Sequence, residues 1–250
     1  MRKFDCIWRG CEATIEGDDL DALTLQVRAH VDEAHNFKLT EANVRDYFEA
    51  EERLSPVRPR LEAIGDIEVS PATPERLDDV LHFFDYEAFA GKPDWAACYC
   101  MSHHVGEDGP DWCRARNRAL LADRIADGTT TGFVAYAGGQ VAAWCNASRR
   151  SEFVDFAGRD EHPDDEVGSI ACFVVAPPYR RHGLSRKLLD AALGSFASRG
   201  LWLAEAYPNA NPRDDSNAYH GALSMYIEAG FEAVGKLEHF DHLTVVQKLR

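Results

Sequence analysis

One short loop holds the residues of this sequence best suited to binding phosphate, Arg180-Arg181-His182-Gly183-Leu184-Ser185. It follows an apolar, β-branched run from Ile170 to Ala176, and apolar residues recur at helical spacing after it. A loop between a strand and a helix presents backbone N–H groups at the helix N-terminus, where the helix dipole also favours an anion. Gly183 allows that anion to approach the backbone closely. We therefore expect a phosphate-bearing ligand at this loop.

The loop is neither a Walker nor a Rossmann phosphate site, because Gly-Lys-Ser/Thr and the G-x-G-x-x-G glycines are missing. It resembles instead the acetyl-CoA motif of the GNAT N-acetyltransferases, V-x-P-x-x-R/Q-x-x-G-x-G/A. Val175, Pro177, Arg180 and Gly183 match this motif, and Ser185 stands where glycine or alanine is usual. The resemblance implies that the loop binds the coenzyme pyrophosphate. An ordinary strand, loop and helix with a basic tip is the alternative.

The strand before the loop is expected to contact the coenzyme as well. The resemblance implies that its last residues offer main-chain groups to pantetheine and one backbone N–H to the thioester carbonyl, as an oxyanion hole does. These residues are Phe173, Val174 and Val175.

A tyrosine further along the chain is the candidate general acid. Tyr226-Ile-Glu-Ala-Gly-Phe231 resembles the Y-x-x-x-G-F element that ends the GNAT core, in which the tyrosine lies beside the coenzyme sulfur. A phenol suits the protonation of a leaving thiolate because it donates a proton while being neutral at pH 7. The family's asparagine seven residues earlier is Tyr219 here. The alternative is a helix tyrosine packed in the core.

Direct transfer to an amine also needs a general base, because only the neutral amine attacks. Glu205, at the end of an expected strand from Leu201 to Ala206, is the first candidate, acting directly or through water. Glu166 and His104 are reserves. A salt-bridged strand carboxylate is the alternative for Glu205.

A long connection from Pro93 to His104 falls where GNAT enzymes build the acceptor site, and loops of this length are often functional. Four of its side chains could bind a metal, hold a substrate amine or supply a nucleophile: Cys98, Cys100, His103 and His104. A packed loop with apolar cysteines is the alternative.

Near the N-terminus, two cysteines and two histidines have the spacing of a zinc site. Cys6-x4-Cys11 is followed, after eighteen intervening residues, by His30-x4-His35. Thiolates and imidazoles are the ligands that Zn2+ prefers, and a domain this small gains stability from a metal. The order is similar to that of a small bacterial and archaeal Cys/Cys/His/His domain family. Two free thiols and two surface histidines are the alternative.

Charge argues against nucleic acid as a partner of this segment. Residues 1–60 contain nine Lys and Arg against thirteen Asp and Glu, and the spacer between the cysteine and histidine pairs is longer than that of a DNA-reading zinc finger. The net charge of the whole chain, −15, disfavours nucleic acid and anionic membranes and would attract a cationic amine. No apolar run approaches the length of a membrane span.

The expected elements predict an α/β fold, with a mixed-sheet GNAT-like domain over residues 67–250. A small ββα-type domain over residues 1–54 precedes it, joined by a linker over 55–66 that contains Pro56 and Pro59. In the larger domain we expect strands at 67–69, 131–137, 140–147, 170–176, 201–206 and 241–248, and helices at 73–84, 111–126, 184–193 and 219–229.

The resemblance therefore implies an enzyme that transfers the acetyl group of acetyl-CoA, its co-substrate, to a primary amine of a small molecule or peptide. The odd cysteine count, seven, and the absence of a secretory segment predict a cytoplasmic protein. The alternative function is a non-catalytic acyl-CoA or metal sensor on the same scaffold.

Overall fold

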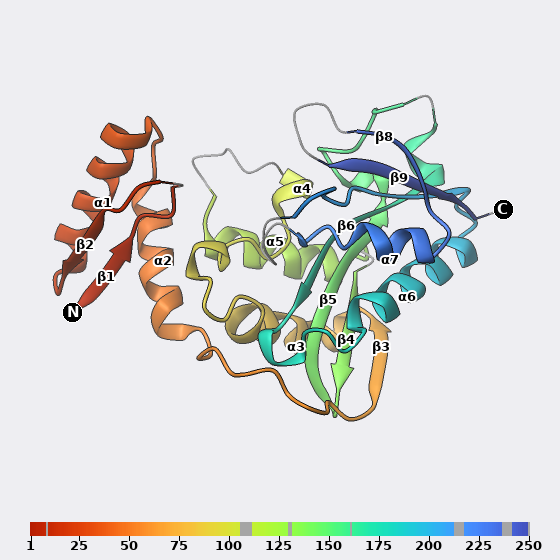
Figure 1. The fold of residues 1–250 in the computed structure, drawn as a ribbon, viewed down its shortest axis with the longest axis horizontal. Helices are drawn as coiled ribbons and strands as arrows, with labels where there is room; N and C mark the ends of the chain where they lie inside the picture. The colour runs from red at the N-terminus through yellow and green to blue at the C-terminus, as the bar shows by residue number, and fades with distance from the viewer. Residues whose placement is uncertain are drawn as a thin grey trace.

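The computed structural model describes residues 1–8, 10–105, 112–129, 132–160, 162–212, 218–236 and 242–249. Figure 1 shows a small N-terminal domain beside a larger α/β domain, with a long connection running between them. The predicted fold class, a mixed-sheet α/β domain preceded by a small N-terminal domain, is therefore confirmed. Within the described residues, every helix is too short or too polar to cross a membrane.

The N-terminal domain pairs β1 (Arg2–Asp5) antiparallel with β2 (Thr14–Gly17) and packs α1 (Leu20–His35) and α2 (Glu41–Arg53) against each other. Asp19 caps α1 by accepting hydrogen bonds from the backbone N–H groups of Asp21 and Ala22. Among its described residues, the core of this domain consists of six buried apolar side chains: Phe4, Leu23, Val27, Val31, Val44 and Phe48. Such a core is small for an independent domain.

Helix α2 was not predicted, and it connects the two domains. Its N-terminus carries a reciprocal capping box between Thr40 and Asn43. Asp46 of α2 accepts a hydrogen bond from the backbone N–H of Arg114, and Ala50 belongs to the core of the larger domain. Residues 55–66 then contain no helix or strand.

The larger domain is a seven-stranded sheet in the order β3-β4-β5-β6-β7-β9-β8 (Figure 1). All neighbouring strands are antiparallel except β6 and β7, which are parallel and joined through α6. The strands are β3 (Ile67–Pro71), β4 (Phe133–Ala137), β5 (Gln140–Arg149), β6 (Val167–Val175), β7 (Leu203–Ala206), β8 (Glu232–Lys236) and β9 (Leu243–Lys248). The helices are α3 (Leu77–His82), α4 (Ser102–Val105), α5 (Arg114–Ala126), α6 (Leu184–Ser198) and α7 (Leu223–Glu228).

Helix α6 holds the sheet together by packing across β3 to β6. Its buried residues are mostly the apolar ones predicted at helical spacing, Leu184, Leu188, Leu189 and Ala192, with Phe196 added at the end. Phe196 fits over β6 because residue 168 is glycine: a Cβ there would come within 2.4 Å of the phenyl ring. The position of α6, and of the loop before it, is therefore fixed by close packing.

The last expected helix begins later in the sequence than predicted. The sequence pattern predicts a helix over 219–229, whereas α7 begins at Leu223. Gly221 has a φ of +89° and Ala222 is extended, so the backbone enters the helix only after these residues. Strand β8 was not predicted, because its side chains are all exposed and carry no apolar alternation.

Candidate active site

The site begins where two parallel strands separate. β6 and β7 stay in register only from Val167↔Leu203 to Ile170↔Ala206, where β7 ends. β6 continues to Val175, and its pairing with β5 shifts register beside Asn146. The edge of β6 from residue 171 to 175 is therefore free of strand pairing on the β7 side. An unpaired strand edge of this kind can hydrogen-bond an extended ligand.

Two residues before α7 contact this free edge. The Phe173 N–H donates a hydrogen bond of 2.6 Å to the Tyr219 carbonyl, and Nδ1 of His220 donates one of 2.5 Å to the Ala171 carbonyl. Because the backbone direction alternates along a strand, the Val175 N–H points to the same side as that of Phe173. Of the residues expected to contact the coenzyme, Phe173 thus already has a partner for its N–H.

The predicted phosphate loop lies at the end of this edge. Gly183 is the N-cap of α6 with a φ of +79°, and a Cβ built on it would meet no atom within 4 Å. Arg180 donates from Nε to the Val175 carbonyl at 3.1 Å, and Arg181 is exposed. His182 donates from Nε2 to the Leu61 carbonyl at 2.9 Å. The loop is therefore anchored on both sides while the N-terminus of α6 stays accessible.

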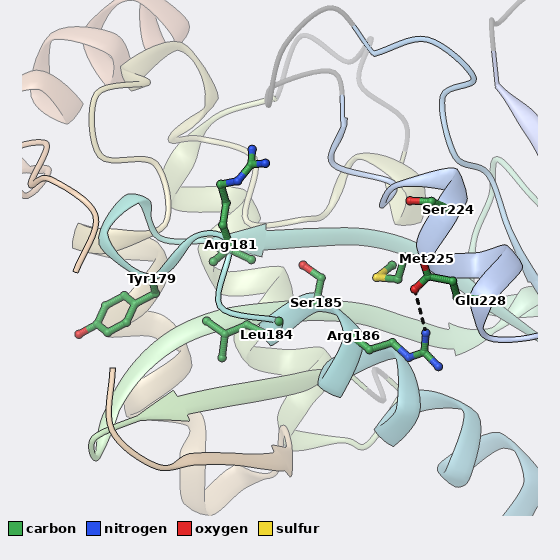
Figure 2. A pocket seen from close by; sticks show the side chains of 10 residues that line it. Tyr179, Arg181, Leu184, Ser185, Arg186, Ser224, Met225 and Glu228 are labelled. Atoms are coloured by element: carbon green, nitrogen blue, oxygen red, sulfur yellow. Dashed lines mark ion pairs between the residues drawn. The ribbon is translucent and has the colours of Figure 1, made fainter. Parts of the chain in front are cut away.

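A pocket of about 300 Å³ opens in front of this N-terminus. Figure 2 shows side chains of α7 facing those at the start of α6 across it, with an ion pair of 3.8 Å between Arg186 and Glu228. The pocket is lined by Val175, Tyr179, Arg181, Gly183, Leu184, Ser185, Arg186, Ser224, Met225 and Glu228. It therefore brings together the end of β6, the predicted loop and α7.

Tyr226 follows Met225, one of the residues that line the pocket, in α7. Its side chain is fully buried, and its hydroxyl donates a hydrogen bond of 2.7 Å to the His220 carbonyl. Burial raises the pKa of the Tyr226 phenol well above its usual value, which keeps the hydroxyl protonated. The tyrosine therefore lies next to the segment that contacts the free edge of β6.

Glu205 is held in a buried polar network. One carboxylate oxygen accepts hydrogen bonds from Ser169 and, at 2.6 Å, from Tyr207; the other lies 3.3 Å from the Arg150 guanidinium. Burial raises the pKa of the Glu205 carboxyl, and the hydrogen bonds and the arginine oppose that shift. The reserve Glu166 is exposed at the opposite end of β6 from the loop.

The four residues predicted on the long connection do not converge on one point. The sulfurs of Cys100 and Cys172 lie 3.4 Å apart, and both side chains are buried. His104 donates from Nδ1 to the Glu152 carbonyl at 2.7 Å, and burial lowers the pKa of its imidazole to about 4. His103 instead contacts Asp155, with Nδ1 2.8 Å from the carboxylate. The arrangement does not support a metal site on this connection.

Asp155 and His220 are the residues of this region that sequence reasoning missed. Asp155 follows His103 by more than fifty residues, and His220 belongs to a segment expected to be helical. No local motif marks Asp155.

The zinc ligands predicted near the N-terminus do come together. Sγ of Cys6 lies 3.2 Å from Nε2 of His35, and Sγ of Cys11 lies 3.5 Å from Nε2 of His30. All four ligand atoms are within 4.8 Å of one another. In a tetrahedral site with Zn–S of about 2.3 Å and Zn–N of about 2.0–2.1 Å, ligand atoms lie roughly 3.3–3.8 Å apart. The donor set and its spacing therefore fit Zn2+.

Comparisons with known proteins agree with this geometry. The model of the acetyltransferase (GNAT) family matches residues 97–214, which include most of the connection, the free edge and the loop. No curated protein matches the chain in sequence.

Three solved structures are similar to part of this chain. The PaiA N-acetyltransferase of Thermoplasma acidophilum in complex with coenzyme A is 14% identical, with 73% of this chain and 99% of that one covered and a TM-score of 0.47. An N-acetyltransferase of Staphylococcus aureus is 13% identical, with 74% and 100% covered and a TM-score of 0.47. The ribosomal-protein-alanine N-acetyltransferase of Brucella melitensis is 18% identical, with 72% and 99% covered and a TM-score of 0.45.

Proposed function

Because this chain carries an acetyltransferase domain of the GNAT family, we propose that it transfers the acetyl group of acetyl-CoA to a primary amine of a small molecule or peptide by direct attack. The observation that carries the proposal is the free edge of β6 that ends at an accessible helix N-terminus. An extended thioester chain can lie along the edge while its pyrophosphate meets the N–H groups of α6.

The loop from Arg180 to Ser185 is the proposed pyrophosphate site. The open space in front of Gly183 admits a phosphate oxygen, and the nearby Arg181 and Arg186 add positive charge around the pocket. The end of β6 offers the N–H of Val175, which lines the pocket, to pantetheine or to the thioester carbonyl. We assign the oxyanion-type donor to this strand.

Tyr226 is the proposed general acid for the departing thiolate. Its protonated hydroxyl lies beside the residues that contact the free edge, which supports this role. Glu205 was our first candidate for the base, and this assignment remains a prediction. Its oxygens already accept three partners, so a base role would require one of them to be released.

An enzyme and a sensor differ in one simple measurement. With acetyl-CoA and a panel of primary amines, the enzyme releases free CoA thiol in an amine-dependent way, whereas a sensor binds acetyl-CoA without releasing thiol. The family match favours the enzyme.

We propose that the N-terminal domain holds one structural Zn2+ through Cys6, Cys11, His30 and His35. The ion would complete a domain whose apolar core is small, and His35 is already oriented by stacking on Trp8 at 4.9 Å. Four protein ligands leave no coordination position open for water or substrate, so the role of this zinc ion is structural.

The expected result is one zinc ion per chain, lost in Cys6→Ser. Loss of the ion should unfold the N-terminal domain, because zinc binding contributes folding free energy in small metal domains. Metal analysis and thermal melting of the full chain measure both effects. Cys113→Ser is the matched control, since Cys113 is equally half-buried and lies outside the cluster. Wild-type chain that melts identically with and without chelator would rule out the structural ion.

A further inference from the structure

We propose that His103 is the general base that takes a proton from the acceptor amine, and that Asp155 positions its ring. This inference rests on the proposed acetyl transfer and names the residue that activates the acceptor. The family match does not identify a base, and neither residue was assigned this role from sequence.

The first observation is the pairing of the two side chains. Nδ1 of His103 donates to the Asp155 carboxylate at 2.8 Å, which leaves Nε2 as the nitrogen with the lone pair. Nε2 is buried and has no hydrogen-bond partner among the described residues. A buried acceptor without a partner is destabilising, so an N–H group placed there would be bound favourably.

The Asp155 carboxylate is suited to holding the His103 imidazole in one orientation. The bond from His103 lowers the pKa of the Asp155 carboxyl, so that it is ionised at neutral pH. A carboxylate on Nδ1 fixes the tautomer and orientation of an imidazole and stabilises the imidazolium that forms when Nε2 takes a proton.

The second observation is the position of His103. Its ring lies 5.2 Å from the ring of His220 and 6.3 Å from that of Tyr219, centroid to centroid. These two residues contact the free edge of β6 through Ala171 and Phe173. His103 therefore reaches the segment beside the proposed thioester site.

The proposed acid approaches the same segment. The Tyr226 hydroxyl is bonded to the His220 carbonyl, while His103 faces the ring of that residue. A base on one side of the thioester and an acid on the other is the arrangement that direct attack requires.

The other candidates for the general base are less suited to that role. Glu205 has partners on both oxygens, and Nε2 of His104 lies 3.2 Å from the amide nitrogen of Asn146 in a buried position. His220 is buried and uses Nδ1 to bind the Ala171 carbonyl. Among these groups, His103 alone combines a carboxylate partner with an unpartnered ring nitrogen.

An alkylammonium ion gives one proton to Nε2 of His103, and the neutral nitrogen forms a bond to the thioester carbonyl carbon. The carbon–sulfur bond then breaks, with its electron pair leaving on sulfur. The sulfur takes a proton from Tyr226, and the second proton of the nitrogen restores the phenol. The products are the N-acetylated amine, the CoA thiol and one proton, which His103 releases to solvent.

His103→Gln tests the proposal, with a primary alkylamine and hydroxylamine as acceptors. We expect kcat for the alkylamine to fall about a hundredfold, as is typical for the loss of a general base. Hydroxylamine is already neutral at neutral pH, so the fall in kcat with hydroxylamine as acceptor should be much smaller. Asp155→Asn should give a smaller loss for the alkylamine, about tenfold, with the same dependence on the acceptor. Acetyl-CoA affinity and melting temperature should stay close to wild type in both variants.

The pH profile of kcat gives a second readout. In the wild-type chain, we expect kcat for the alkylamine to rise with pH. In His103→Gln this rise in kcat should move to higher pH, because the amine must then lose its proton to solvent. The charged or titratable groups around His103 are Asp155, His104, Tyr219, His220 and Arg159. His82→Gln, at an exposed position on α3, is the control and should leave the profile unchanged.

Two results would overturn the assignment. Wild-type kcat in His103→Gln, or an equal loss for alkylamine and hydroxylamine, would show that the ring is not a base. If instead the wild-type chain acetylates no acceptor at all, the proposed function fails, and the base assignment fails with it. The wild-type reaction thus separates the two failures.

Discussion

Replacing Gly183 by valine should weaken acetyl-CoA binding about a hundredfold while leaving the chain folded. The valine side chain would project into the space proposed for the pyrophosphate, because a Cβ at this position meets no protein atom within 4 Å. Two charge-assisted hydrogen bonds from the N-terminus of α6 would then be lost. At about 1.5 kcal/mol each, their loss corresponds to roughly a hundredfold in affinity.

Backbone strain is the competing effect, and a matched control measures it. Gly139 has the same φ of +79°, and a Cβ there also meets no atom within 4 Å, but it lies in the β4–β5 hairpin turn. Gly139→Val should therefore lower the melting temperature without changing acetyl-CoA affinity. Isothermal titration and thermal melting of both variants separate strain from blocked binding. Wild-type affinity in Gly183→Val would place the pyrophosphate elsewhere.

Tyr226→Phe should lower kcat about a hundredfold and leave acetyl-CoA affinity unchanged, because general acid catalysis is typically worth that much. The hydroxyl is needed when the thiolate departs and barely before, so its loss affects the transition state. The phenyl ring keeps the edge contact with Phe231, whose centroid lies 5.1 Å away.

The variant also removes a buried hydrogen bond to the His220 carbonyl, and a moderate loss of stability, about 1 kcal/mol, is expected from that alone. Tyr136→Phe is the control for the loss of a tyrosine hydroxyl away from the site, because the Tyr136 hydroxyl also donates a bond of 2.7 Å, to Asp79. It should leave kcat unchanged and lower the stability less than Tyr226→Phe does, because the Tyr136 bond is exposed. A Tyr226→Phe protein that melts early but turns over normally would make the tyrosine structural.

Local sequence patterns predicted the parts of the site that local backbone geometry creates. The strand, loop and helix around Gly183 are continuous in sequence, so their periodicity and turn residues were sufficient. The zinc ligands were equally recognisable, because two short spacings place each pair on one element or turn.

The parts of the site that sequence patterns did not predict are created by tertiary contacts. The bond between His103 and Asp155 depends on how two distant connections pack. The partners of Glu205 are Arg150 just after β5, Ser169 in β6 and Tyr207 just after β7. Sequence patterns also did not show that Tyr219 and His220 leave the helix to contact β6, because one glycine with a positive φ decides where α7 begins.

The most direct test of the account is the stoichiometry of acetyl transfer by the wild-type chain. Incubation with acetyl-CoA and a panel of primary amines is followed by mass spectrometry of the acceptors and by titration of free thiol. We predict that at least one amine gains one acetyl group for each CoA thiol released, and that Gly183→Val lowers both signals together. Tight acetyl-CoA binding with no acetylated amine across the panel would contradict the account and favour a sensor.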